Sequence, residues 1–175
     1  LPERYGALCE ANAQARPPVI FGLQVQGLQT WSLAAHADHL QVQPALDDNR
    51  VLTVSLSEPD FERLILDQLT LFEQGAPMIA PRALRWDDET RRLITAMPGC
   101  ILVRIADQET TRKVWLTPGL WSLEVQEARC TIDCELSDLM AVKAGSQQVM
   151  ELFFAGKLRI DGDVQLALAL AGVLM

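Results

Sequence analysis

The sequence is short of positive charge and of long apolar runs. Its 15 lysines and arginines face 23 aspartates and glutamates, which leaves a net charge of −8. A negatively charged protein has no general affinity for phosphate backbones or anionic membrane surfaces. No apolar run reaches the roughly 20 residues that cross a bilayer, because the longest, Val164 to Met175, is interrupted by Gln165. We therefore expect no nucleic-acid partner and no membrane span.

Short motifs of familiar catalytic centres are also missing. The chain contains no GxSxG, HExxH or P-loop pattern. A serine nucleophile, a zinc-protease site and a nucleotide-binding loop are therefore not predicted. We expect a protein that is not an enzyme, has no catalytic residues and needs no cofactor.

Cysteine is scarce, and its spacing excludes the common metal and redox motifs. Cys9, Cys100, Cys130 and Cys134 form no CxxC pair and no Cys/His arrangement of a zinc site. We interpret them as reduced and mostly buried side chains. No basic-then-apolar signal peptide opens the sequence at Leu1, and together these features favour a cytoplasmic location.

Three polar clusters have cation-binding residue types, and each has a simpler interpretation. His36 and His39 lie in a predicted hairpin, where side chains three residues apart do not share one face and so cannot bind a metal ion together. Asp47-Asp48 is interpreted as a solvated loop, and Asp87-Asp88-Glu89 as the acidic first turn of a helix. No metal site is predicted.

The first half has the pattern of short strands followed by capped helices. Alternation of apolar residues with serine and threonine in Val51–Ser57 predicts a strand with one buried face. Ser57 suits a helix N-cap, with Pro59 in the first turn and Asp60 at the positive end of the helix. Elements are expected as helices at 3–15, 57–75 and 87–97, three strands within 19–42, and strands at 51–57 and 83–86.

The second half repeats this order of elements. Cys130, Ile132 and Cys134 alternate with polar residues and predict a strand with one apolar face, while Asp163 suits the N-cap of the terminal helix. Elements are expected as strands at 100–105, 113–116, 120–125, 129–135 and 157–160, and helices at 137–143, 146–154 and after 163. These patterns predict an α+β fold, with mostly antiparallel sheet covered by helices.

Matching residues in the two halves indicate an internal duplication. Asp60 precedes Asp138 by 78 residues, and Pro18 precedes Pro98 by 80. A period near 80 is too long for a solenoid unit, so these offsets favour a duplicated small domain. The alternative is a chance agreement between two β-rich halves with capped helices.

A duplication divides the chain into residues 1–97 and residues 98–175. Each half alone would have a thin core, because short chains bury little of their surface. We therefore expect the halves to pack as one globular unit, about a pseudo-twofold axis.

The segment Phe153–Leu168, with the sequence FFAGKLRIDGDVQLAL, closely resembles the C-terminal signature of the sterol carrier protein type-two family. In that family a helix ends in a Gly-Lys-Leu strand, and a Gly-Asp turn starts the final helix. The strand Cys130–Asp133 and the following Ser137–Met140 are similar to the family's strand-to-helix step. The resemblance covers about 97–175 and, through the repeat, more faintly 18–97, which lacks the Gly-Lys and Gly-Asp pairs.

This resemblance implies a nonspecific lipid-transfer fold, in which helices cover a five-stranded sheet and leave a tunnel for sterols, fatty acyl chains or other lipids. The signature residues Gly156, Lys157, Gly162 and Asp163 are interpreted as structural, with the glycines in tight turns and Asp163 as a helix cap. The expected ligand cavity is lined by Phe153, Phe154, Leu158, Ile160, Leu166, Ala169, Leu170 and Val173.

Two functions follow from this interpretation. The first is binding or transfer of a lipid or other hydrophobic small molecule, which predicts an internal void. The alternative is a non-catalytic interaction or accessory module whose cavity is filled by tryptophans, which predicts a filled core and an exposed apolar patch. The tryptophans concerned are Trp31, Trp86, Trp115 and Trp121. The sequence is also compatible with a protein partner or with a homodimer.

Overall fold

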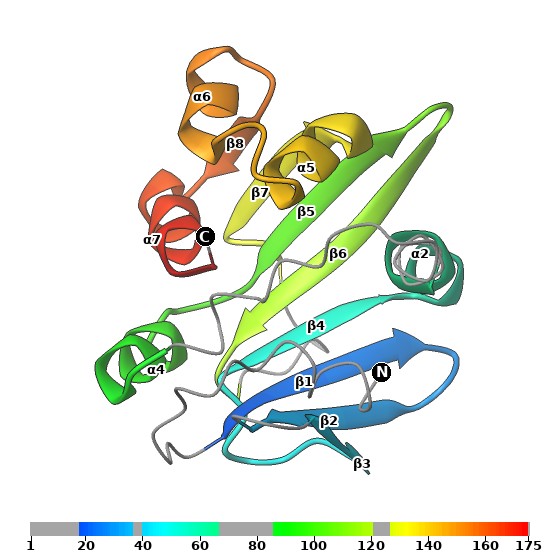
Figure 1. Ribbon diagram of the computed structural model, residues 1–175, viewed down its shortest axis with the longest axis vertical. Helices are drawn as coiled ribbons and strands as arrows, with labels where there is room; N and C mark the ends of the chain where they lie inside the picture. The colour runs from blue at the N-terminus through cyan, green and yellow to red at the C-terminus, as the bar shows by residue number, and fades with distance from the viewer. Residues whose placement is uncertain (1–17, 37–39, 67–85, 121–126, 175) are drawn as a thin grey trace.

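A computed structural model describes residues 18–36, 40–66, 86–120 and 127–174 (Figure 1). The predicted helix at 3–15 and most of the predicted strands at 83–86 and 120–125 lie outside these residues. The described strands form one mixed sheet of eight, in the order β3-β2-β1-β4-β6-β5-β7-β8. They are β1 (Val19–Gln26), β2 (Thr30–Ala35), β3 (Leu40–Pro44), β4 (Leu52–Ser57), β5 (Ile101–Asp107), β6 (Thr110–Pro118), β7 (Cys130–Glu135) and β8 (Arg159–Gly162).

Two helices begin at the caps that the sequence predicts, Ser57 and Asp163. Ser57 Oγ accepts from the amide of Asp60 at 3.3 Å, and the carboxylates of Asp87 and Asp163 cap two later helices in the same way. Within the described residues, none of the helices is long and apolar enough to cross a membrane. The helices are α2 (Glu58–Phe61) with the π-helical turn η1 (Glu62–Leu66), α4 (Asp88–Thr95), α5 (Leu136–Lys143), α6 (Val149–Phe154) and α7 (Val164–Leu174).

The register of the sheet gathers apolar side chains on one face. Phe21 is level with Leu52 in the neighbouring strand, and Ile101 is level with Leu116 and Cys130. Because side chains that are level in paired strands point to the same side, most aliphatic residues of the eight strands share one face, whereas Ile20 and Leu102 lie on the other. The other face carries mostly serine, threonine, glutamine and charged residues. The sheet is therefore two-sided, with one face that needs cover.

Helices α4 and α7 cover part of the apolar face and lie side by side (Figure 1). They contribute Ile94, Leu166 and Leu170, which are at most 5% exposed, to the main buried cluster. The strands contribute Val19, Ala35, Ile101 and Cys130 to the same cluster, and Trp86 adds an aromatic contact with Phe21 at 5.5 Å between ring centroids. One core therefore joins strands from both ends of the chain.

The fold class is α+β, as predicted, and most strand pairings are antiparallel. Two pairs are parallel, β1 with β4 and β5 with β7. The strands β2-β1-β4 and β6-β5-β7 thus have the same order and the same relative directions. A two-fold axis would reverse either the order or the direction, so a pseudo-twofold axis does not fit these strands. Under the duplication hypothesis, the halves are related by a translation along the sheet.

A prediction concerns the turn between β8 and α7. Gly162 has φ +89°, and a Cβ added there would lie 2.5 Å from the carbonyl oxygen of Arg129. Gly156 also has a positive φ, +70°, but a Cβ there meets nothing within 4 Å. Gly156→Ala should therefore cost only the conformational penalty of about 1 kcal/mol, and Gly162→Ala should lower the free energy of unfolding by clearly more. Urea unfolding of both variants measures the difference. Equal losses would mean that the Arg129 backbone relaxes freely.

Candidate functional site

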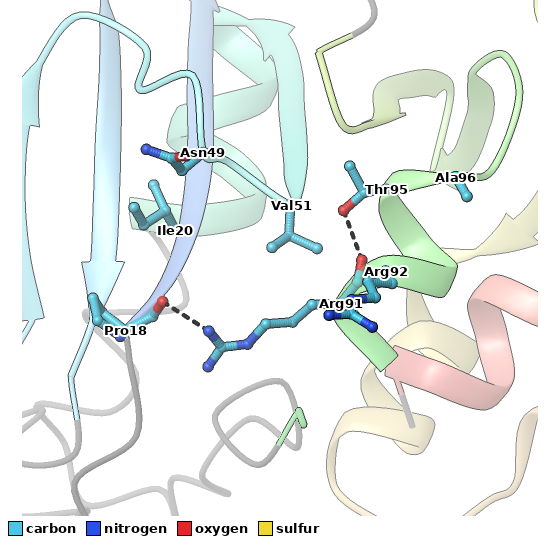
Figure 2. Close-up of a pocket in the computed structure, with 8 residues that line it drawn as sticks. All are labelled: Pro18, Ile20, Asn49, Val51, Arg91, Arg92, Thr95 and Ala96. Carbon is cyan, nitrogen blue, oxygen red and sulfur yellow. Dashed lines mark hydrogen bonds between the residues drawn. The ribbon is translucent and has the colours of Figure 1, made fainter. Parts of the chain in front are cut away.

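A pocket of about 640 Å³ lies at one end of the sheet, between α4 and the segments that lead into β1 and β4 (Figure 2). It is a hollow that opens widely to solvent, not an enclosed internal void. Both walls include apolar side chains. The pocket is lined by Pro18, Ile20, Asn49, Val51, Arg91, Arg92, Thr95 and Ala96.

The strand wall is built by the parallel pairing of β1 and β4. The amide of Val51 donates to the carbonyl of Ile20 at 2.8 Å, which joins the two segments just where β4 begins. Val51 is only 5% exposed and forms the apolar floor, while Ile20 is half-buried and projects from the polar face of the sheet. The floor is therefore continuous with the main core, to which Val51 belongs, and Ile20 extends it onto the polar face of the sheet.

The helix wall is fixed because the apolar side of α4 is anchored in the core by Ile94, which is fully buried. This orientation leaves Arg91, Arg92 and Thr95 around the pocket (Figure 2). Arg91 Nη1 donates to the carbonyl of Pro18 at 3.3 Å, so its side chain spans from the helix wall to the strand wall. Thr95 Oγ1 donates to the carbonyl of Arg91 at 2.6 Å. The site combines an apolar floor with a cationic rim.

The predicted cavity residues do not line this pocket. Leu166 and Leu170 belong to the main buried cluster, and the partly buried Ile160 of β8 packs against that cluster. Leu158 is half-buried, Ala169 is exposed, and the side chain of Val173 lies outside the described part. The structure therefore brings three of the predicted residues together, as core.

The two phenylalanines of the predicted cavity lie apart from that core. Phe153 and Phe154 contact each other edge to face, with ring centroids 5.8 Å apart. Phe154 is 78% exposed, which is too much for a residue that lines an internal cavity, whereas Phe153 is half-buried. The sequence pattern missed this, because two adjacent positions at the end of a short helix cannot both face the sheet.

The four signature residues occupy turns and caps. Gly156 and Gly162 both have positive φ, and Asp163 accepts from the amide of Leu166 at 3.0 Å. Lys157 Nζ donates to Asp138 Oδ1 at 3.1 Å, which ties the turn before β8 to the start of α5. Each contact holds a chain reversal rather than a ligand.

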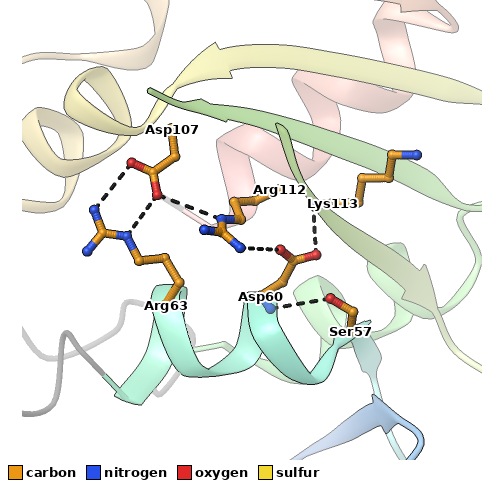
Figure 3. A network of polar contacts seen from close by, with 6 residues as sticks. All are labelled: Ser57, Asp60, Arg63, Asp107, Arg112 and Lys113. Atoms are coloured by element: carbon orange, nitrogen blue, oxygen red, sulfur yellow. Dashed lines mark hydrogen bonds and ion pairs between the residues drawn. The ribbon is translucent and has the colours of Figure 1, made fainter. Parts of the chain in front are cut away.

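A network of charged side chains joins α2 and η1 to the hairpin of β5 and β6 (Figure 3). Asp60 accepts from the backbone amide of Lys113 at 3.2 Å and from Arg112 Nη1 at 3.5 Å. Asp107 accepts two hydrogen bonds from Arg63, at 2.8 and 3.2 Å, and forms an ion pair with Arg112 Nε at 3.7 Å. The network therefore fixes the helix that follows β4 on strands from the second half of the chain.

The sequence repeat pointed to one residue of this network, Asp60. Asp60 and Asp138, related by the 78-residue offset, are both 8% exposed and both lie in the first helical turn after a parallel strand. Asp60 contacts β6, and Asp138 contacts the residue Lys157 just before β8. The long-range arginine partners were not predictable, because they come from a distant hairpin.

The pKa values of four partly or fully buried side chains are shifted by their surroundings. The hydrogen bonds from Arg63 hold the pKa of the Asp107 carboxyl below its ordinary value, although burial acts in the opposite direction. Burial raises the pKa of the Cys134 thiol to about 11, and Cys100 and Cys130 are shifted the same way. These three cysteines are free, as predicted, and Cys9 lies outside the described residues.

The structure describes two of the three polar clusters that have cation-binding residue types, Asp47-Asp48 and Asp87-Asp88-Glu89. The carboxylate of Asp47 accepts from the amide of Asn49 at 2.7 Å, and that of Asp87 caps α4. In the part of the chain with described positions, no group of three metal-ligating side chains converges. Residues 37–39 lie outside that part.

Comparisons with known proteins identify the family. A family model described as the SCP-2 sterol transfer family matches residues 82–175, which is more than half of the chain. The chain belongs to the SCP-2 sterol transfer family. The match includes the helix wall of the pocket and excludes its strand wall. No curated protein sequence matches the chain.

Solved structures of this family show low overall similarity. Sterol carrier protein 2 like 2 from Aedes aegypti is 17% identical with a TM-score of 0.38, and the alignment covers 63% of this chain and 94% of that one. Sterol carrier protein 2 from Yarrowia lipolytica is 20% identical with a TM-score of 0.36, and the alignment covers 43% of this chain and 66% of that one. A UbiJ-SCP2 ubiquinone synthesis protein is 20% identical with a TM-score of 0.36, and the alignment covers 67% of this chain and 90% of that one.

The network predicts a specific dependence of stability on pH. The pKa of Asp107 is lower in the folded than in the unfolded chain. Asp107 therefore stabilises the fold at pH values above its ordinary pKa of about 4, and this stabilisation is lost as the pH falls through the lowered pKa of the folded chain. Asp107→Asn should lower the urea midpoint at pH 7 and reduce its fall between about pH 5 and pH 3.

The matched control is Asp133→Asn, which breaks the exposed ion pair with Arg104 on the polar face of the sheet. Exposed pairs contribute little to stability, so this variant should behave nearly as the wild type. An Asp107→Asn profile parallel to that of the control would contradict the role given to Asp107.

Proposed function

We propose that this chain binds and transfers a lipid or another hydrophobic small molecule, without catalysing a reaction. The observation that carries the proposal is the pocket beside α4, which has a buried aliphatic floor and lies partly in the segment that matches the SCP-2 sterol transfer family. Affinity would come from moving apolar ligand surface out of water, at roughly 25 cal/mol per Å². Few polar groups would be needed, and those at the rim would set the ligand's orientation.

The domain division supports a supplementary proposal about assembly. Residues 1–97 and 98–175 would be two related halves that share one sheet through the pairing of β4 with β6. Asp60 and Asp138, at matching places, would then hold equivalent helices on their neighbouring strands. In this arrangement core side chains such as Leu166 and Leu170 would occupy the cavity expected from the C-terminal half, and the pocket at the sheet end would take its place.

The proposal predicts that a bulky side chain at the pocket rim blocks binding. Ala96 is exposed at the C-cap of α4 and lines the pocket, so Ala96→Trp should weaken binding of a fluorescent fatty acid by about tenfold or more, equivalent to about 1.4 kcal/mol. Ala155 is the exposed C-cap of α6 and does not line the pocket, so Ala155→Trp is a matched control with unchanged binding.

Native mass spectrometry of the purified wild type, with lipid analysis of a parallel solvent extract, gives the ligand class directly. A stoichiometric adduct that is missing from Ala96→Trp supports the proposal. A clean apo mass together with no uptake of fluorescent fatty acid would reject it and favour an interaction module. Equal uptake by both tryptophan variants and the wild type would move the ligand away from this pocket.

A further inference from the structure

We infer that the two ends of the sheet are matching docking edges for a second copy of this chain, and that β3 and β8 cover these edges in the single chain. In the contact between copies, the outer edge of β7 would pair with the outer edge of β2 of the next copy. This contact would repeat between copies the pairing of β4 with β6 within one chain. It involves none of the residues that line the pocket.

The sheet repeats one unit of three strands, once as β2-β1-β4 and once as β6-β5-β7. In both units, one residue of the central strand is level with a leucine of the antiparallel neighbour and with the first paired residue of the parallel neighbour. The residues at these three places are Phe21, Leu33 and Leu52 in the first unit, and Ile101, Leu116 and Cys130 in the second. Because the register is the same, the two units present equivalent edges to a neighbouring strand.

Strand β3 covers the edge of β2 as β4 covers the edge of β6. Leu116 of β6 is level with Val54 of β4. The equivalent residue of β2, Leu33, is level with Val42 of β3. Both covering strands begin with leucine and have valine two residues later. On the β2 edge, β3 therefore has the place and the register of β4, but it is the last strand at that end of the described sheet (Figure 1).

Strand β8 covers the edge of β7 as β6 covers the edge of β4. Leu52 of β4 is level with Pro118 of β6. Its equivalent in β7, Cys130, is level with Gly162 of β8. The residues that follow these pairs make the same backbone hydrogen bond, from Gly119 to Val51 at 2.8 Å and from Asp163 to Arg129 at 3.0 Å. Strand β8 is therefore a four-residue substitute for the nine-residue β6.

A carboxylate binds the covering strand in both units. Asp60, after β4, accepts from the backbone amide of Lys113 in β6 at 3.2 Å. Asp138, after β7, accepts from Lys157 Nζ just before β8 at 3.1 Å. Both lysines lie five residues before the last residue of the covering strand. Equivalent carboxylates thus hold the strand that covers each edge.

Two features explain why a single chain keeps its edges covered. Short edge strands with proline or charged residues are typical of sheets that avoid pairing with other chains, and Pro44 ends β3 while Arg159 and Asp161 lie in β8. Each covering strand also belongs to the same molecule as its edge, so its effective concentration exceeds that of a second copy. Weakening β3 in one copy and β8 in another therefore leaves one β2 edge and one β7 edge to pair.

The register of that contact follows from the pairing of β4 with β6. Ile132 of β7 would lie level with Leu33 of the next copy, so that apolar side chains meet on one face. Asp138 would accept a hydrogen bond from the amide of Thr30, which is the residue of β2 equivalent to Lys113. Because the two edges differ, the contact is head to tail and leaves one edge of each copy for further association.

The test opens one edge in each of two full-length variants. In the β3-released variant, Leu40→Asp and Val42→Asp place charges on the apolar face of β3. In the β8-released variant, Lys157→Ala removes the contact with Asp138, and Ile160→Asp places a charge beside the main cluster. Native mass spectrometry counts the subunits in each variant and in an equimolar mixture, and hydrogen exchange measures the protection of the β2 and β7 amides.

Each released variant alone should stay monomeric, because it opens only one of the two matching edges. The mixture should form a heterodimer that is at least about tenfold more abundant than either homodimer. Association should stop at two copies, because the remaining ends of the heterodimer are still covered. Hydrogen exchange should slow in β2 of the β3-released variant and in β7 of the β8-released variant.

The matched control carries Leu93→Asp and Val164→Asp, which change exposed apolar side chains of α4 and α7 and alter the net charge by the same amount. It should form no dimer with either released variant. Urea unfolding shows whether each variant is folded. Val42→Asp and Lys157→Ala, single changes at half-exposed side chains, form a second pair that is mixed and measured in the same way.

A heterodimer that forms only in the mixture of the released variants, with slower exchange in β2 and β7, supports the inference. Folded variants whose mixture stays monomeric overturn it. Homodimers as abundant as the heterodimer also overturn it, because the two edges are then not matched, and so does a dimer with the control. None of the substitutions changes a residue that lines the pocket, so each outcome leaves the proposed function as it stands.

Discussion

The pairing of β4 with β6 is the contact on which the rest of the architecture depends. It joins a strand of the first half to a strand of the second and aligns Val54 with Leu116 and Leu56 with Val114. Since a shift of one residue would turn every side chain of a strand to the opposite face, this register is strongly constrained. With it in place, the apolar faces of both strand groups merge into one surface.

A continuous apolar surface explains where the helices and the charged network lie. Helices α4 and α7 cover part of it, and α2 lies at the end of β4, where Asp60 accepts a hydrogen bond from the backbone amide of Lys113 just beyond the last residue pair of β4 and β6. Burying that carboxylate is tolerated because Arg112 and the amide satisfy it. The arginine pairs are therefore the means by which a short helix is held on strands that come from a distant part of the chain.

Local features of this fold were predictable from the sequence, and long-range ones were not. Alternation in Val51–Ser57 and the caps at Ser57 and Asp163 depend on neighbouring residues, so strand and helix positions were predicted closely. The order of strands depends on pairings between residues more than 50 apart, such as Leu56 with Val114. The candidate site was missed for the same reason: Ile20 and Arg92 meet only after the sheet forms, and neither belongs to a local motif.

The position of the pocket follows from the one departure from antiparallel order in the first half of the chain. Parallel strands begin at the same edge of a sheet, so the segments entering β1 and β4 emerge together, joined by the bond from Val51 to Ile20. At that edge Val51 is buried in the main core, whereas Ile20, on the other face of the sheet, is only half-buried. Helix α4 lies alongside with its apolar side anchored in the core through Ile94, so it offers the sheet end two arginines, Thr95 and the small Ala96. An apolar floor with a cationic rim is thus a consequence of how the helix is anchored.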